Sequence, residues 1–120
     1  DVESQGAMGV VMNAPITNLN LAAVAAAVDI PVVITVTKAD TNIADRLNAG
    51  ASVLNIACGA QTPNVVRATR EKWPDVPIIA SGGSTGESIR QTIRSGANAV
   101  TYTPPSTAQL FKDMMAAYRE

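Results

Sequence analysis

Hydrophobic and polar residues follow one another along this chain in a repeated order. Short apolar runs rich in β-branched residues, as in buried strands, lie near residues 9–14, 31–37, 52–58, 77–81 and 98–103. A longer segment with helical spacing follows each run, and the last one covers roughly residues 106–119. Strands that alternate with helices form βαβ units, so the pattern predicts a parallel sheet of five strands.

An internal repeat supports these elements. The segment Ile30 to Gly59 aligns with the segment Val76 to Pro105 over about thirty positions without a gap, at a shift of about 46 residues. Residues 6–13 match only the tail of this unit, so we expect the sequence to begin inside a repeat. We therefore expect a single (βα)5 domain over residues 1–120 that forms the C-terminal part of a longer barrel.

The two faces of the predicted sheet differ in polarity, because side chains alternate along a strand. One face is almost wholly apolar and consists of Val10, Met12, Val32, Ile34, Val36, Leu54, Ile56, Ile78, Ala80, Val100 and Tyr102. The other face becomes polar toward the strand ends, as in Val33, Thr35 and Thr37. A doubly wound sheet needs two apolar faces, so the pattern favours a partial TIM barrel with helices outside only. The alternative is a flavodoxin-like open, doubly wound sheet that buries these hydroxyl groups beneath a helix layer.

The sequence IIASGGST, from Ile78 to Thr85, runs from a strand through two glycines into a helix start. Glycine lets the backbone approach a ligand closely, and the first amides of a helix attract negative charge. The candidates for phosphate binding are Gly82, Gly83, Ser84 and Thr85. The same segment also fits a plain turn in which Ser84 caps its own helix, with Glu87 at the spacing of a capping box.

The stretch IIASGGSTGESIRQTIRSGANAVTYT resembles the seventh and eighth βα units of the phosphate-binding (βα)8-barrel superfamily. That superfamily includes isomerases and synthases of histidine and tryptophan biosynthesis and the IMP dehydrogenases. The stretch is also similar to proteins related to the glycerol uptake operon antiterminator. The resemblance is close over about 40 residues and extends loosely through the repeat, and it implies that this chain supplies strands four to eight of a barrel.

In that superfamily, the glycines after strand seven and the loop after strand eight hold one phosphate. The resemblance implies this role here for the residues Gly82, Gly83, Ser84, Thr103 and Ser106. The sequence departs from the family at Pro104 and Pro105, where the family commonly has a glycine. Proline has no N–H to donate to a phosphate, so the second half of this site depends on the helix start that follows.

Composition excludes several classes of function. The 9 basic and 10 acidic residues give a net charge of −1 and aromatic residues are 3% of the chain, which argues against a nucleic-acid binder. The absence of histidine removes imidazole-based triads and zinc sites, and neither a metal cluster nor a cofactor motif is visible. The single cysteine, Cys58, cannot form a disulfide within the chain, and no apolar run is long enough to cross a membrane. We expect a cytoplasmic protein.

Few reactive side chains lie near the predicted strand ends. Lys38 is a candidate catalytic residue, because a lysine there can form a Schiff base or hold an anion, although a solvated loop lysine is the commoner finding. Asn13 and Asn55 are candidates for orienting a ligand from the inner face. Asp40 can act as a general base but fits better as a helix cap, and Cys58 fits a buried, inert thiol.

Two functions remain open from the sequence. One is a barrel-type enzyme, or a fragment of one, that acts on a small phosphorylated metabolite as an isomerase, lyase or hydrolase. The other is a regulatory domain that binds such a ligand, or an inorganic anion, without converting it. Two unpaired sheet edges and an uncovered inner face predict a homodimer, or pairing with a missing N-terminal segment.

Overall fold

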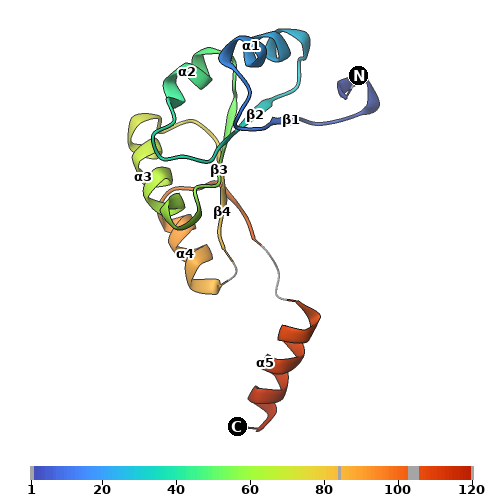
Figure 1. Ribbon diagram of the computed structural model, residues 1–120, viewed down its shortest axis with the longest axis vertical. Coiled ribbons are helices and arrows are strands. Elements are labelled where there is room, and N and C mark those ends of the chain that lie inside the picture. Colours follow the sequence, from blue (N-terminus) through green and yellow to red (C-terminus); the bar gives the residue numbers. More distant parts are fainter. Residues whose placement is uncertain (1, 84, 103–105, 120) are drawn as a thin grey trace.

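The fold is a parallel sheet flanked by helices, seen in a computed structural model that describes residues 2–83, 85–102 and 106–119. The helical elements are η1 (Glu3–Gln5), α1 (Asn18–Ala27), α2 (Ile43–Asn48), η2 (Gly59–Gln61), α3 (Thr62–Lys72), α4 (Gly86–Arg94) and α5 (Thr107–Arg119). The strands are β1 (Val10–Met12), β2 (Val32–Val36), β3 (Val53–Ile56), β4 (Ile78–Ser81) and β5 (Ala99–Thr101). They pair in parallel in the order β1-β2-β3-β4-β5, and the sheet is not closed (Figure 1). This confirms the predicted α/β architecture of five parallel strands that alternate with helices.

The helices α1 to α4 lie on one side of the sheet (Figure 1). The sheet register places Ile34, Leu54 and Ile78 side by side on three neighbouring strands, and all three are fully buried. Leu21 of α1 and Val66 of α3 are buried in the same core. The predicted apolar face is therefore the core face, because parallel strands need a helix layer to cover them.

The opposite face of the sheet has no helix layer among the described residues. Val11 of β1 is 59% exposed, Ala99 and Thr101 of β5 are exposed, and Asn55 of β3 is only half-buried. A doubly wound sheet would cover these positions with helices. The one-sided helix layer agrees with a barrel-like arc and places the polar strand ends of β2, β3 and β4 on the open face.

One member of the predicted core is exposed. Tyr102 belongs by strand parity to the apolar face, but its side chain is 60% exposed. The reason is the position of α5, which stands apart from the sheet instead of returning over β5 (Figure 1). No residue of α5 is buried, so the fifth βα unit is left open while the first four are packed.

Candidate functional site

The turn between β4 and α4 brings three of the predicted phosphate-binding residues together. Gly82 is buried, its amide donates to the carbonyl of Thr101 at 2.7 Å, and a Cβ there would collide with the side chain of Val100. This glycine therefore allows two strands to approach, and its amide is engaged in the sheet. Gly83 has a φ of 75°, in the left-handed region that favours glycine, and turns the chain across the start of α4.

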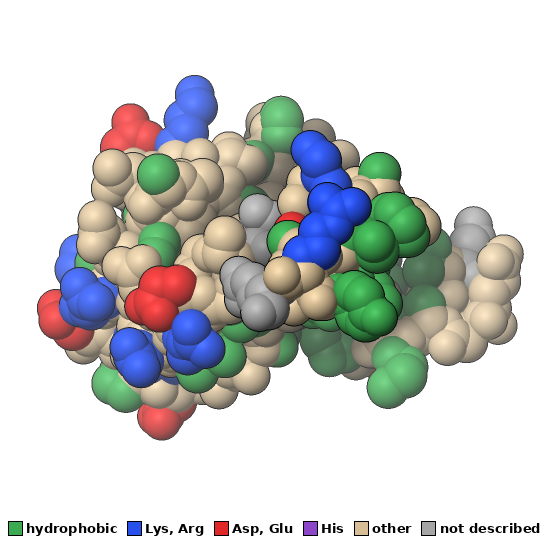
Figure 2. All heavy atoms as spheres, turned by 90° about the horizontal axis from the view of Figure 1, so that it is seen from below, with side chains coloured by type: hydrophobic (Ala, Val, Ile, Leu, Met, Phe, Trp, Pro, Cys, Tyr) green, Lys and Arg blue, Asp and Glu red, His purple; other side chains and the backbone are tan. Residues whose placement is uncertain are grey.

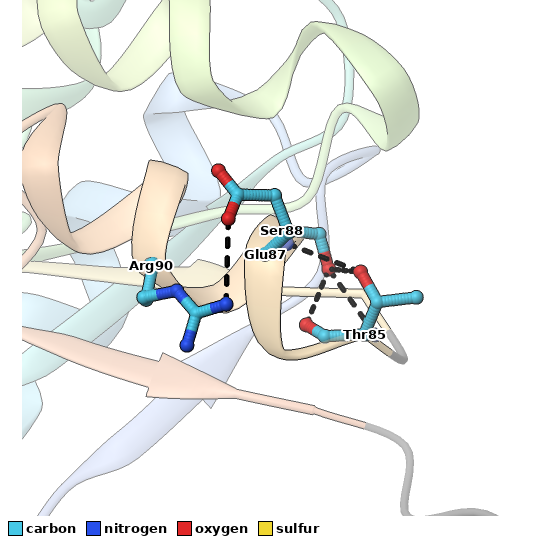
Figure 3. A network of polar contacts seen from close by, with 4 residues as sticks. All are labelled: Thr85, Glu87, Ser88 and Arg90. Carbon is cyan, nitrogen blue, oxygen red and sulfur yellow. Dashed lines mark hydrogen bonds and ion pairs between the residues drawn. The ribbon is translucent and has the colours of Figure 1, made fainter.

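The start of α4 is capped by a residue other than the predicted one. Thr85 is the N-cap, and its hydroxyl accepts from the Ser88 amide at 3.1 Å, while the Ser88 hydroxyl donates to the Thr85 carbonyl at 2.9 Å (Figure 3). The predicted capping box of Ser84 and Glu87 is therefore wrong by one residue. Ser84 itself lies outside the described residues. The shift leaves the Gly86 and Glu87 amides without an acceptor among the residues described.

An arginine that the sequence analysis did not single out lies beside this helix start. A Cβ built on Gly86 would lie 3.8 Å from both terminal nitrogens of Arg90, so the guanidinium flanks the first turn of α4. Arg90 also forms a 3.4 Å ion pair with Glu87, and both side chains are well exposed (Figure 3). Because this pair is open to water, the guanidinium is weakly held and can exchange to another anion. The i, i+4 spacing of Gly86 and Arg90 could have predicted this contact, because residues four apart lie on the same face of a helix.

A second group of candidates surrounds a pocket of about 270 Å³ at the ends of β1 and β2. Its lining consists of Ala14, Pro15, Thr35, Thr37, Lys38, Thr41 and Arg46. The Arg46 guanidinium donates to the carbonyls of Ala14 at 2.6 Å and Ile16 at 2.5 Å, which fixes the loop after β1. The sequence did not predict a role for Arg46, because no pattern in α2 indicates that this side chain reaches the loop after β1. The pocket combines two cationic side chains with hydroxyl groups, so it suits an oxygen-rich or anionic group.

Asn55 adjoins this pocket through Thr35. The Asn55 side-chain amide nitrogen donates to the Thr35 hydroxyl at 3.4 Å, across the register that pairs these two residues. The Asn55 Oδ1 atom is buried and has no hydrogen-bond partner among the described residues. A buried acceptor without a donor is destabilising, so this oxygen is a candidate for contact with a bound group.

The remaining predicted residues lie apart from these two groups. Asn13 is exposed after β1 and does not line the pocket, although its neighbours Ala14 and Pro15 do. Ser106 accepts from the Gln109 amide at 3.1 Å at the start of α5. Thr103 lies outside the described residues. The structure thus brings together Gly82, Gly83 and Thr85 in one turn, places Lys38 in the pocket, and links Asn55 to the pocket-lining Thr35.

Asp40 and Cys58 lie outside both groups of candidate residues. Asn42, not Asp40, caps α2 by accepting from the Asp45 amide at 3.1 Å, so the predicted cap is corrected by two residues. Asp40 instead lines a cleft of about 610 Å³ between the start of α2 and one face of α3. The Cys58 thiol packs against the core and lies 3.5 Å from the Val36 carbonyl oxygen, and burial raises its pKa.

The described residues contain neither a metal-binding cluster nor a membrane-spanning helix. They hold no group of three or more acidic or cysteine side chains placed to bind a metal ion. None of the helices within ranges 2–83, 85–102 and 106–119 has the length and hydropathy needed to span a membrane.

Comparison with known proteins supports the fold. No protein-family model and no curated protein matches the sequence. A solved structure described as "Native KDPGal structure" matches 87% of this chain and 48% of its own, with a TM-score of 0.64 and 24% identity. NtrX from Brucella abortus matches 92% of this chain and 26% of its own, with a TM-score of 0.51 and 15% identity. The chain thus spans about half the length of the first protein, and the likeness to that protein shows a partial barrel-like fold alone.

Proposed function

We propose that this chain supplies the phosphate-binding part of a barrel-like enzyme that acts on a small phosphorylated metabolite. The observation that carries the proposal is the β4–α4 turn, where a left-handed Gly83, the first turn of α4 and the Arg90 guanidinium lie together. A phosphate is the anion that such a combination suits best, because it accepts from backbone amides and a guanidinium at once. The solved structure described as "Native KDPGal structure" shares the fold, and this supports an enzyme-type scaffold.

The second pocket would receive the rest of the metabolite. The pocket of Lys38 and Thr35 and the turn at Gly83 follow β2 and β4, so both lie at the carboxyl edge of the sheet. Strands two apart in a sheet are separated by about 10 Å, which is the scale of a small sugar phosphate. In this arrangement the phosphate is the anchor, Lys38 meets an oxygen or carbonyl group, and Asn55 Oδ1 accepts a hydrogen bond from a hydroxyl.

The proposal is tested by isothermal titration of the chain with inorganic phosphate and with a small sugar phosphate. Gly83→Val should abolish binding, because the side chain would crowd Ser88 Oγ, 2.8 Å from the Cβ position, and oppose the left-handed φ. Gly6→Val is the matched control, since Gly6 also has a positive φ but its Cβ would meet open space. Equal binding by wild type and Gly83→Val would overturn the proposal.

The arginine provides an independent test. Arg90→Gln should weaken phosphate binding about tenfold, because a charge-assisted hydrogen bond is lost. Arg94→Gln is the matched control, since Arg94 is also exposed on α4 and lies one turn further along. If the two variants bind phosphate equally, the guanidinium of Arg90 has no part in the site.

The alternative is a domain that binds the ligand without converting it. The observation in favour of this alternative is that the described pocket after β2 has few free reactive groups. Lys38 is the only lysine that lines it, and the Arg46 guanidinium already donates to three oxygen acceptors. Enzymes need a group that moves a proton or attacks the substrate. Sugar-phosphate binding with the same affinity in wild type and Lys38→Met, and no turnover of any bound ligand, would favour this alternative.

A further inference from the structure

The last helix presents an apolar stripe to solvent. The residues of this stripe are Leu110, Phe111, Met114, Met115 and Tyr118, which recur at helical spacing along one face of α5. Phe111 is 65% exposed, Met114 69% and Tyr118 88%. Figure 2, which views the molecule from the end that carries α5, shows hydrophobic side chains gathered beside a row of Lys and Arg side chains. Such a stripe normally faces a core.

Isolation makes this helix unstable unless something covers it. α5 has 13 residues, and helices of that length are marginal in water when they stand alone. Packing of the amphipathic face supplies most of the stability of helices in proteins. The stripe therefore requires a partner surface.

The same chain carries an uncovered surface of matching kind. In the repeat, each of the first four helices returns to the sheet beside the preceding helix, and the place left for a fifth helix is the flank of α4 next to β5. There Ile93 of α4 is 53% exposed and Tyr102 after β5 is 60% exposed. The donor stripe and this acceptor surface lie on one chain, yet α5 points away from α4 (Figure 1).

We propose that α5 packs against the α4 and β5 flank of a second copy of this chain, whose own α5 returns the contact. Reciprocal exchange of a terminal element gives a closed, two-fold dimer. Each buried aromatic ring contributes about 150–250 Å², so two copies of the stripe and of its acceptor reach the roughly 1,200–2,000 Å² of a stable interface.

The exchange does not depend on the proposed function, because it involves no ligand. It is tested by disulfide cross-linking in a Cys58→Ala background, which removes the native thiol. Ile93→Cys and Phe111→Cys proteins are prepared separately, mixed, and oxidised with glutathione disulfide. We expect a covalent heterodimer, and Arg67→Cys mixed with Phe111→Cys is the matched control, since Arg67 is exposed on α3 away from the acceptor.

Two further measurements test the exchange of α5 between two copies. Sedimentation velocity should give a dimer for the wild-type chain and a monomer for Phe111→Asp, which places a charge on the stripe. In the double variant carrying Ile93→Cys and Phe111→Cys, an intramolecular disulfide at monomer mass would show that α5 docks on its own chain, and it would overturn the proposal. A wild-type monomer without any cross-link would overturn it as well.

Discussion

The amide of Gly82 donates a hydrogen bond to the carbonyl of Thr101 at 2.7 Å, so the pairing of β4 with β5 continues into the glycine pair. A Cβ on Gly82 would collide with Val100 and lie 3.1 Å from Ile89 Cγ1. Gly83, by contrast, is exposed and turns the chain through a positive φ. The two adjacent glycines therefore have different physical roles, the first in packing and the second in turning the chain toward α4.

Gly82→Ala should lower the free energy of unfolding by about 1–3 kcal/mol, because the added methyl group overpacks the space between Val100 and Ile89. Gly86→Ala is the matched control: its Cβ meets only the flexible end of Arg90 at 3.8 Å, and alanine favours a helix. Urea unfolding of both variants measures the difference. Equal stability of the two would show that the sheet tolerates a Cβ at Gly82.

The strands and their parallel pairing could be predicted because each βα unit repeats the same local pattern. Ile34, Leu54 and Ile78 share the apolar strand parity, and the structure pairs them in one buried row. Strand parity also identified the core face, since alternation is a local property of the backbone. It failed at Tyr102, because burial there depends on where a distant helix packs.

The candidate site could be predicted only in part, for a similar reason. The turn at Gly83 could be predicted, because the conformational freedom of a glycine after a strand is a local property of the sequence. The neighbourhoods of Arg46 and Arg90 depend on how their helices are rotated against adjoining loops, and Arg46 reaches a carbonyl 30 residues away in sequence. Caps shifted by one or two residues, as at Thr85, because several neighbouring hydroxyl and amide side chains compete for the same helix start.

Asn55→Leu should raise stability and weaken ligand binding. The Asn55 Oδ1 atom is buried without a described donor, so an apolar side chain of similar size removes an unsatisfied group and should add about 1–3 kcal/mol to the free energy of unfolding. If the oxygen contacts a ligand, affinity for a sugar phosphate falls in the same variant. Urea unfolding and titration calorimetry on one preparation check both effects. A Leu variant less stable than wild type would contradict the prediction.

Arg70 should contribute to the stability of the fold at the amino-terminal ends of β4 and β5. Its guanidinium donates to the carbonyls of Gly96 at 2.8 Å and Val76 at 2.7 Å and to the Asn98 side chain at 2.5 Å, which ties two loops together. Arg70→Lys cannot keep this fork of bonds, so we expect a loss of about 3 kcal/mol. Arg67→Lys, on the exposed face one turn earlier, should change stability by less than about 0.5 kcal/mol. Thermal unfolding of the two variants measures both changes, and equal stability of the two would contradict the prediction.

Cys58 should make stability depend on alkaline pH. Burial raises the pKa of its thiol, so the folded chain holds this proton more tightly than the unfolded chain does. The stability due to this shift is therefore fully present below the unfolded thiol pKa of about 8.5, and it is lost as the pH rises through the folded pKa. We expect the free energy of unfolding of the wild type to fall more steeply above about pH 8.5 than that of Cys58→Ala.

The comparison of Cys58→Ala with the wild type isolates the thiol, because the lysine and tyrosine side chains that also titrate at high pH are the same in both proteins. Loss of the Sγ atom lowers the stability of the variant at every pH, so the slope with pH, not the offset, is the measurement. Reaction of the folded wild type with a thiol reagent at pH 8 should also be slower than that of the urea-unfolded chain, since the thiolate is the reacting form. Parallel pH profiles for the two proteins, together with equal reaction rates folded and unfolded, would mean that the thiol is not desolvated by its contacts with the core.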